Sequence, residues 1–258
     1  MHFVETNGTK IPALGFGTYR LGDDEAERMV SEALEIGYRH IDTAQMYGNE
    51  AGVGRAIRNS GVDRGEIFLT TKVWPNNFER EDLLSAMQGS LDKLGLDHVD
   101  LVLLHWPSTS VPLKETISAL NESRERGDTR HIGVSNFEPE LLLEAAGMSD
   151  APIINDQVEY HPFKSQKPVL DEARSQGISL TAYRPLAKGS VYGNETLRRI
   201  AEAHGKDEGQ VALRWLIQQE GVIAIPKTSN PGRARSNFDI FDFELSEEEM
   251  SSIDALAS

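Results

Sequence analysis

The chain has no cysteine among its 258 residues, and it has no long apolar run. The missing cysteines exclude disulfides, thiolate metal sites and cysteine nucleophiles. The most apolar stretch, residues 99–106, is interrupted by Asp100 and is too short to span a bilayer. Residues 1–7 carry neither a basic cap nor an apolar run, which argues against a signal peptide. The sequence therefore predicts a cytoplasmic protein without a membrane partner.

Basic residues are also scarce. Lysine and arginine total 26 against 41 aspartates and glutamates, so the formal net charge is −15. Such a chain repels nucleic acid unless it carries a local basic patch, so we expect no nucleic-acid partner. Only 9 of the basic residues are lysine. This composition fits a halophilic protein that stays soluble in high salt, and it also fits an ordinary acidic enzyme. Inactivation in low-salt buffer would indicate the first.

Apolar strand-like runs alternate with amphipathic helical patterns along almost the whole chain. Strands are predicted at 13–18, 39–43, 67–73, 99–105, 131–136, 152–159, 179–183 and 222–226. Helices are predicted at 24–36, 49–60, 80–94, 112–126, 138–147, 166–176, 194–204, 208–219 and 246–256. Strands that alternate with helices, without a linker between the units, favour one parallel sheet covered by helices. We therefore predict an α/β fold, a (β/α)8 TIM barrel that forms a single domain over residues 1–258.

Two further features distinguish this barrel from a doubly wound sheet. Residues 3–11 have Asn7-Gly8 at their centre and predict an N-terminal β-hairpin. A doubly wound sheet usually has a glycine-rich turn after its first strand. Here the segment GFGTYR at 15–20 lacks the third glycine. The hairpin and the number of strand–helix units both favour the barrel.

Four ionisable residues lie at or just after the ends of three neighbouring predicted strands. Asp42 ends the second strand and Tyr47 follows it, Lys72 ends the third, and His105 ends the fourth. Active sites of such barrels are built at the carboxyl ends of the strands, so we expect these residues at one rim. Taken singly, Asp42 is explained as a turn or cap residue, Tyr47 as packing and His105 as a core histidine. Lys72 is the hardest to explain structurally, because an unpaired buried ammonium is costly.

These residue types together fit the reduction of a carbonyl group. Tyrosine, with an ordinary pKa near 10, is a reluctant acid. A lysine ammonium beside it would lower the pKa of the Tyr47 hydroxyl, and a carboxylate would hold Lys72 in its charged form. His105 would donate a hydrogen bond to the carbonyl oxygen. None of the four can supply a hydride, so a cofactor must do so.

The sequence resembles the aldo-keto reductase family, and within it the prokaryotic 2,5-diketo-D-gluconate reductase-like branch. The resemblance rests on IPALGFGT at 11–18, GYRHIDTAQMYGNE at 37–50, TKVW at 71–74, LHWP at 104–107, GVSNF at 133–137 and IPKT at 225–228. It extends to about Asn237. It implies an NADP-dependent oxidoreductase that reduces aldehydes or ketones to alcohols, with Asp42, Tyr47, Lys72 and His105 as the catalytic tetrad and Tyr47 as general acid.

The resemblance also assigns residues to the cofactor, NADPH or NADP. Ser135, Asn136 and Gln157 match residues that bind the nicotinamide carboxamide, and the ring of Tyr183 matches the one that stacks on the nicotinamide. Lys227, Thr228 and Arg233 match the group that grips the 2′-phosphate, and Asn237 matches an adenine contact. Lys227 and Arg233 also form a local cationic cluster in an acidic chain, which a phosphate would explain. The other expected cofactor contacts are Gly17, Thr18, Asp42, Arg184 and Leu186.

Two departures from the family concern the substrate. Arg184 stands where serine is usual, so it is expected to contact a phosphate or a substrate carboxylate. The chain stops soon after the helix at 246–256, without the tail that helps to close the pocket in many members. We therefore expect an open pocket with Tyr19, Trp74 and Trp106 as walls, Tyr47 and His105 as further substrate contacts, and broad specificity. The family implies a monomer.

Two other functions compete with this interpretation. A non-catalytic redox sensor would bind NADPH on the same scaffold, and NADPH oxidation with a generic aldehyde would discriminate it from an enzyme. A metal-dependent isomerase or hydrolase would need clustered histidine and carboxylate ligands at strand ends. His161 follows a strand, His40 lies inside one and His131 begins one, so no ligand set emerges and no metal is expected.

Overall fold

The chain opens with a β-hairpin, as predicted. The structure is a computed structural model, and it describes residues 2–257. Strands β1 (Phe3–Thr6) and β2 (Thr9–Pro12) pair in antiparallel register, with Thr6 opposite Thr9. Both turn residues have positive φ, 45° at Asn7 and 78° at Gly8. Such turns twist in the same sense as the strands they connect, which explains the preference for Asn-Gly.

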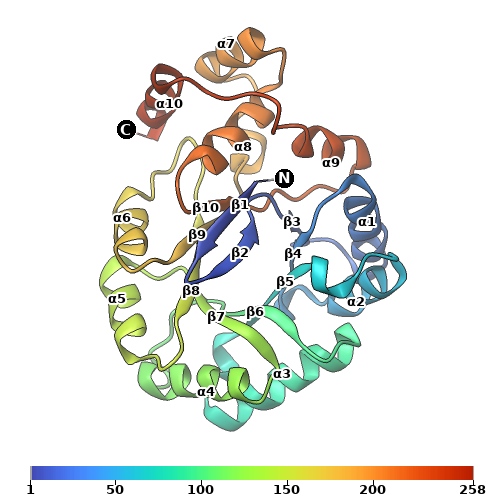
Figure 1. The fold of residues 1–258 in the computed structure, drawn as a ribbon, viewed down its shortest axis with the longest axis vertical. Coiled ribbons are helices and arrows are strands. Elements are labelled where there is room, and N and C mark those ends of the chain that lie inside the picture. The colour runs from blue at the N-terminus through green and yellow to red at the C-terminus, as the bar shows by residue number, and fades with distance from the viewer. Residues whose placement is uncertain (1, 258) are drawn as a thin grey trace.

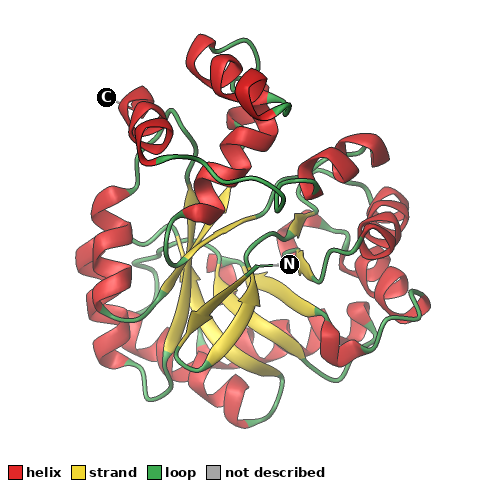
Figure 2. Ribbon diagram, turned by 45° about the horizontal axis from the view of Figure 1, so that its top comes forward, coloured by secondary structure: helices red, strands yellow, loops and turns green. Residues whose placement is uncertain are grey.

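Parallel strands of the remaining chain form the barrel, with helices outside them (Figures 1 and 2). Within residues 2–257 the sheet has eight strands in sequence order: β3 (Phe16–Gly17), β4 (His40–Asp42), β5 (Phe68–Val73), β6 (Val99–Leu104), β7 (Thr129–Ser135), β8 (Ile153–Glu159), β9 (Ser179–Tyr183) and β10 (Val222–Ala224). A parallel bridge between Leu14 and Ala224 closes the circle, with Gly15 N–H donating to Ala224 O at 2.8 Å. The predicted (β/α)8 fold is confirmed.

Helices follow the strands and cover the outside of the barrel. They are α1 (Asp23–Ile36), α2 (Glu50–Asn59), α3 (Arg80–Leu94), α4 (Leu113–Glu125), α5 (Pro139–Met148), α6 (Lys167–Ser175), α7 (Glu195–His204), α8 (Glu208–Gln218), α9 (Pro231–Phe238) and α10 (Glu247–Asp254). Two of these, α7 and α10, pack against each other at the periphery, where His204 Nε2 lies 2.9 Å from Glu249 Oε1. No helix in the described residues is long and apolar enough to cross a membrane.

Most predicted elements begin and end within two residues of the observed bounds, and two details differ more. Helix α9 is absent from the predicted helices, because Asn230-Pro231-Gly232 has the composition of a loop. Proline is favoured at the first position of a helix, and the Asn230 side chain caps this one by accepting from Arg233 N–H at 3.1 Å. The first barrel strand is also shorter than the predicted 13–18 and is reduced to Phe16–Gly17 beside the Leu14 bridge.

The hairpin closes the barrel at the amino-terminal ends of its strands (Figure 1). The hairpin's own Val4 and Ile11 are buried, and Thr6 Oγ1 lies within hydrogen-bond distance of Ile154 O and Gly177 O, at 3.1 and 2.8 Å. The opposite end, where the strands finish in Asp42, His105 and Tyr183, has no such cover from the hairpin. Polar side chains are therefore free to gather there.

Candidate active site

Lys72 joins the predicted tetrad at the carboxyl ends of the strands. Strand β5 directs its side chain between Asp42, at the end of β4, and Tyr47, in the 3₁₀ turn Gln45–Tyr47. Its Nζ donates to Asp42 Oδ1 at 2.6 Å, to Thr43 O at 2.9 Å and to the Tyr47 hydroxyl at 3.3 Å. An ammonium has three protons to donate, and each has an acceptor here.

Lys72 and Asp42 are almost fully buried, with side-chain exposures of 0% and 2%. Burial alone lowers the pKa of Lys72, but the charge of Asp42 and the contact with Tyr47 outweigh it, so the pKa lies above its ordinary value. Lys72 therefore stays protonated at neutral pH, in line with the rule that a buried charge is paired and hydrogen-bonded.

The Tyr47 hydroxyl differs from the sequence-based expectation in the direction of its pKa. We expected Lys72 to lower it. Burial raises the pKa of Tyr47 above its ordinary value, and the charge and hydrogen bond of Lys72 offset only part of that rise. Tyr47 is thus a protonated phenol at neutral pH, as a proton donor must be. Lys72 would stabilise the phenolate once the proton leaves.

His105 lies across from Tyr47, with ring centroids 5.7 Å apart at 76°, and Trp74 packs edge-on against its other side at 5.1 Å. Burial, followed by the nearby charge of Lys72, lowers the pKa of His105 to about 3. The imidazole is therefore neutral at neutral pH. Its buried Nδ1 has no hydrogen-bond partner in the described part of the chain.

A hydrogen-bonded chain continues from the tetrad to the ends of β7, β8 and β9. Gln157 Nε2 donates to Asp42 Oδ2 at 2.7 Å, and Gln157 O accepts from Ser135 Oγ at 2.7 Å. Asn136 Nδ2 donates to His105 O at 3.1 Å, and Asn136 Oδ1 accepts from the Tyr183 hydroxyl at 2.9 Å. Asn136 has φ +63°, a left-handed conformation that asparagine tolerates better than most residues.

A cavity of about 510 Å³ opens over these groups. It is lined by most of the predicted site residues: Gly17, Tyr19, Asp42, Tyr47, His105, Trp106, Ser135, Asn136, Gln157, Tyr183, Arg184, Leu186, Lys227, Thr228, Arg233 and Asn237. Three predicted residues are not in this lining. Lys72 lies beneath it, Trp74 packs on His105, and Thr18 is buried and donates its hydroxyl to Asp42 O at 2.9 Å.

Sequence reasoning missed several lining residues: Arg20, Met46, Glu159, Pro185, Lys188, Gly189, Tyr192, Ile225 and Pro226. Arg20, Met46, Pro185 and Pro226 are direct neighbours of predicted residues, and Glu159 and Ile225 lie two positions from one, so adjacency could have found these six. The other three belong to the segment from Lys188 to Tyr192, between β9 and α7. Its signal is Gly189 and Gly193 in a loop that follows a barrel strand, since such loops carry the ligand contacts of this fold.

The cavity is cationic although the chain is acidic. Arg20, Lys188, Lys227 and Arg233 line it, and none of these four makes an ion pair within residues 2–257. Arg184 is different, because its Nη1 lies 3.4 Å from Glu159 Oε1. Unpaired cations around a cavity favour a ligand that carries several negative charges.

The model of the aldo/keto reductase family matches residues 13–258. The chain belongs to the aldo/keto reductase family. The glyoxal reductase of Bacillus subtilis is 45% identical over 251 residues, which cover 97% of this chain and 90% of that protein. The family resemblance expected from the motifs is confirmed.

Solved structures of the family superpose closely on this one. A putative 2,5-diketo-D-gluconic acid reductase B is 52% identical with a TM-score of 0.98, covering 99% of this chain and 91% of that chain. An aldo-keto reductase of Bombyx mori, solved in complex with NADP, is 35% identical with a TM-score of 0.93, covering 99% and 92%. This aldo/keto reductase therefore shares the fold of these relatives over 99% of its own length.

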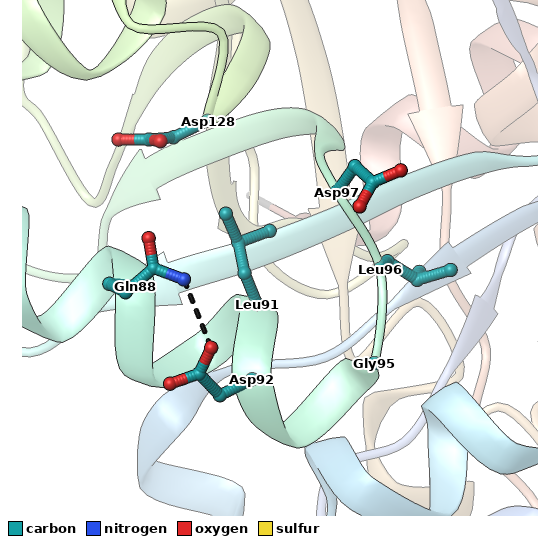
Figure 3. A pocket seen from close by; sticks show the side chains of 7 residues that line it. All are labelled: Gln88, Leu91, Asp92, Gly95, Leu96, Asp97 and Asp128. Atoms are coloured by element: carbon teal, nitrogen blue, oxygen red, sulfur yellow. Dashed lines mark hydrogen bonds between the residues drawn. The ribbon is translucent and has the colours of Figure 1, made fainter.

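The molecule has a second hollow, about 460 Å³, at the amino-terminal end of the barrel (Figure 3). It lies where α3 leads into β6 and is lined by Gln88, Leu91, Asp92, Gly95, Leu96, Asp97 and Asp128. Gln88 Nε2 donates to Asp92 Oδ1 at 3.0 Å (Figure 3). Arg126 Nε forms an ion pair with Asp128 Oδ2 at 3.6 Å. Among the described residues no group of histidine, aspartate and glutamate side chains could hold a metal ion.

Proposed function

We propose that this aldo/keto reductase transfers a hydride from NADPH to the carbonyl carbon of a small aldehyde or ketone, with Tyr47 giving its proton to the carbonyl oxygen. The observation that carries the proposal is the buried ammonium of Lys72, held 2.6 Å from Asp42 and 3.3 Å from the Tyr47 hydroxyl at the floor of the cavity. A phenol beside a buried ammonium is suited to release a proton into a reacting group.

The residues of the cavity fit a nicotinamide dinucleotide with a 2′-phosphate. Lys227 and Arg233, together with the Thr228 hydroxyl, would hold the phosphate, since unpaired cations in an acidic chain indicate an anionic ligand. The remaining contacts follow the family pattern: Ser135, Asn136 and Gln157 for the carboxamide, Tyr183 for the nicotinamide face, Asn237 for the adenine, and Gly17, Thr18, Asp42 and Leu186 along the length of the cofactor. When bound, the cofactor supplies the hydride that no side chain can provide.

The chain's own residues would control the proton. Tyr47 is protonated because burial raises its pKa, and Lys72 would hold the phenolate that remains after proton transfer. Asp42 keeps Lys72 charged and in place. His105, neutral because its pKa is lowered to about 3, would donate a hydrogen bond from Nε2 to the carbonyl oxygen. Together these groups hold the carbonyl oxygen while negative charge develops on it.

The substrate would enter beside Tyr19, Met46 and Trp106. Met46 and Trp106 are 47% and 43% exposed, which supports an open pocket that accepts many carbonyl compounds. The name of the Bacillus subtilis relative points to two-carbon dicarbonyls as first candidates. Arg184 would meet a phosphate or a substrate carboxylate, although Glu159 neutralises part of its charge. We further propose a cytoplasmic monomer, whose inactivation in low salt would identify its acidic surface as an adaptation to salt.

Oxidation of NADPH in the presence of glyoxal or another small aldehyde tests the proposal. We expect turnover by the wild-type protein, and a loss of kcat of about 10²–10⁴-fold in Tyr47→Phe, which removes the proton donor and keeps the ring. NADPH binding, followed by the fluorescence of the cofactor, should be unchanged in this variant. NADPH binding without turnover of any aldehyde or ketone would instead support the non-catalytic redox sensor. Full activity of Tyr47→Phe would rule out the proposed acid.

A further inference from the structure

Gln157 makes a contact that binding of a cofactor carboxamide does not require. Its Nε2 donates to Asp42 Oδ2 at 2.7 Å, and both residues are 2% exposed. The other oxygen of the same carboxylate, Oδ1, accepts from Lys72 Nζ at 2.6 Å. The two oxygens of Asp42 are thus shared between the amide of Gln157 and the ammonium that contacts Tyr47.

The chemistry of this contact fixes the orientation of the Gln157 amide. An ionised carboxylate only accepts hydrogen bonds, so the NH₂ group of the amide must face Asp42. The amide oxygen, Oε1, then faces away from Asp42. The backbone adds a further constraint, because Gln157 O accepts from Ser135 Oγ at 2.7 Å and from Asn136 N–H at 3.0 Å. Residues at the end of β7 therefore hold the backbone of Gln157, and Asp42 at the end of β4 holds its side chain.

The geometry points to Gln157 as a positioning residue for the proton donor, acting through Asp42 and Lys72 on Tyr47. This inference rests on the proposed function, since it assigns to Tyr47 the role of acid. Gln157 fixes the plane of the Asp42 carboxylate, and that plane sets the position of the Lys72 ammonium, 3.3 Å from the Tyr47 hydroxyl. The side-chain amide of Gln157, which is expected to contact the nicotinamide carboxamide, would thereby also influence the proton donor Tyr47.

Loss of the Gln157 amide would change the positions of Asp42 and Lys72 and, through them, the pKa of Tyr47. Without Gln157 Nε2, Asp42 Oδ2 is a buried anionic oxygen with no partner, which is costly. The carboxylate would turn to share both oxygens with Lys72, and the ammonium would follow it away from Tyr47. Less stabilisation of the phenolate raises the pKa of Tyr47 further and weakens it as an acid.

A double-mutant cycle on the cofactor-free protein tests the contact without relying on activity. Gln157→Met keeps the length of the side chain and removes its hydrogen bonds, and Asp42→Asn removes the charge. We expect Gln157→Met to lower the urea midpoint of unfolding in the wild-type background and to lower it much less in the Asp42→Asn background. Additive losses in the two backgrounds would overturn the inference, whether or not the protein proves to be a reductase.

Gln210→Met is the matched control. Gln210 is also a buried glutamine, and its Nε2 donates to Ser236 O and Asp239 O at 3.1 and 2.8 Å, far in sequence from the tetrad. Its loss of stability should add to that of Asp42→Asn, because the two sites share no partner. If Gln157→Met does not fold, Gln157→Asn, which keeps the amide on a shorter side chain, enters the same cycle.

The pH profile separates positioning from cofactor binding alone. In Gln157→Met we expect kcat with saturating NADPH to fall at least tenfold, and the alkaline limb of the kcat profile to move to higher pH, because the pKa of Tyr47 rises. A residue that only binds the carboxamide would raise KM for NADPH and leave the limb in place. An unshifted limb with unchanged kcat would therefore count against the assignment.

Discussion

The two ends of the barrel carry hollows of similar volume, about 510 Å³ at the carboxyl ends of the strands and about 460 Å³ at the amino ends. The hollow at the amino ends, called the lower hollow below, is lined by three aspartates, Asp92, Asp97 and Asp128 (Figure 3). Asp92 and Asp97 are exposed to solvent. The cavity at the carboxyl ends, called the upper cavity below, lies over the buried pair of Lys72 and Asp42. It is lined by cations that make no ion pair within residues 2–257: Arg20, Lys188, Lys227 and Arg233. What distinguishes a site from a hollow here is positioned, buried charge.

Buried charge alone is still not sufficient, as Asp100 at the amino end of β6 shows. Its carboxylate is 5% exposed, accepts from Leu69 N–H at 2.9 Å and pairs with Arg64 and Arg130 at 2.7 and 3.4 Å. None of these partners lines either of the two cavities. Lys72 resembles Asp100 in burial, but two of its partners, Asp42 and Tyr47, line a cavity. The difference between a structural and a chemical cluster therefore lies in partners that a ligand can reach.

The largest expected effect comes from removing one charge at each end. Lys72→Met leaves Asp42 buried without its cation, which should cost about 3–5 kcal/mol of stability, and should lower kcat by about 10²–10⁴-fold. Asp100→Asn should cost about 1–3 kcal/mol and leave kcat and KM unchanged. Urea unfolding and steady-state kinetics measure both. A loss of kcat in Asp100→Asn that still folds would contradict the claim that the Asp100 cluster has only a structural role.

A smaller effect is expected from the cations of the upper cavity. Lys227→Gln and Arg233→Gln should each raise KM for NADPH by about 10–100-fold, since a hydrogen bond to a charged group contributes about 1.5–3 kcal/mol. KM for NADH should not change, because NADH lacks the 2′-phosphate. Arg126→Gln, beside the lower hollow, is the control, and its KM for NADPH should equal that of the wild type. If the variants raise KM for NADH and KM for NADPH by the same factor, these cations contact another part of the cofactor than the 2′-phosphate.

Asp156 offers a test by pH. It is fully buried, neither carboxylate oxygen has a well-formed hydrogen bond in the described residues, and burial raises its pKa from 3.8 to about 8. Between these values the folded protein keeps a proton that the unfolded chain releases, so stability falls as pH rises through this window. The slope is about 1.4 kcal/mol per pH unit for one proton. Asp156→Asn should remove this dependence of stability on pH, whereas Asp92→Asn should leave it unchanged. The free energy of urea unfolding, measured from pH 5 to pH 9, tests the prediction.

The smallest effect is expected at the lower hollow itself. Asp92→Asn and Asp97→Asn remove charges from exposed positions, and stability should change by less than about 0.5 kcal/mol. kcat and KM should not change, and added Mg²⁺ or Ca²⁺ should not shift the melting temperature. A clear shift with either ion that these variants abolish would make the lower hollow a binding site after all.

Much of the fold could be predicted because its signals are local and periodic. Helix α3 was predicted with its observed bounds, and so was strand β9. Helix α9 was not, because Pro231 and Gly232 signal a turn and only the cap made by Asn230 shows that they begin a helix. Barrel closure through Leu14 and Ala224 rests on pairing across the whole chain, which periodicity does not reveal.

The sequence predicts those residues of the candidate site that lie at the ends of strands. Asp42, Lys72 and His105 stand out because polar residues end apolar strands. The direction of the Tyr47 pKa was not accessible, because it depends on how deeply the phenol is buried. The contact between Gln157 and Asp42 joins residues 115 positions apart, and only the closed barrel brings them together.

The hairpin at the amino-terminal end has a consequence for exchange with solvent. β1 and β2 cover one end of the barrel, and its interior is a packed core, so no passage leads through the barrel to the Tyr47 hydroxyl. The cavity over Tyr47 opens at the other end of the strands. Any reactant and product would therefore exchange through that one cavity, and slow release of a product would limit the turnover rate.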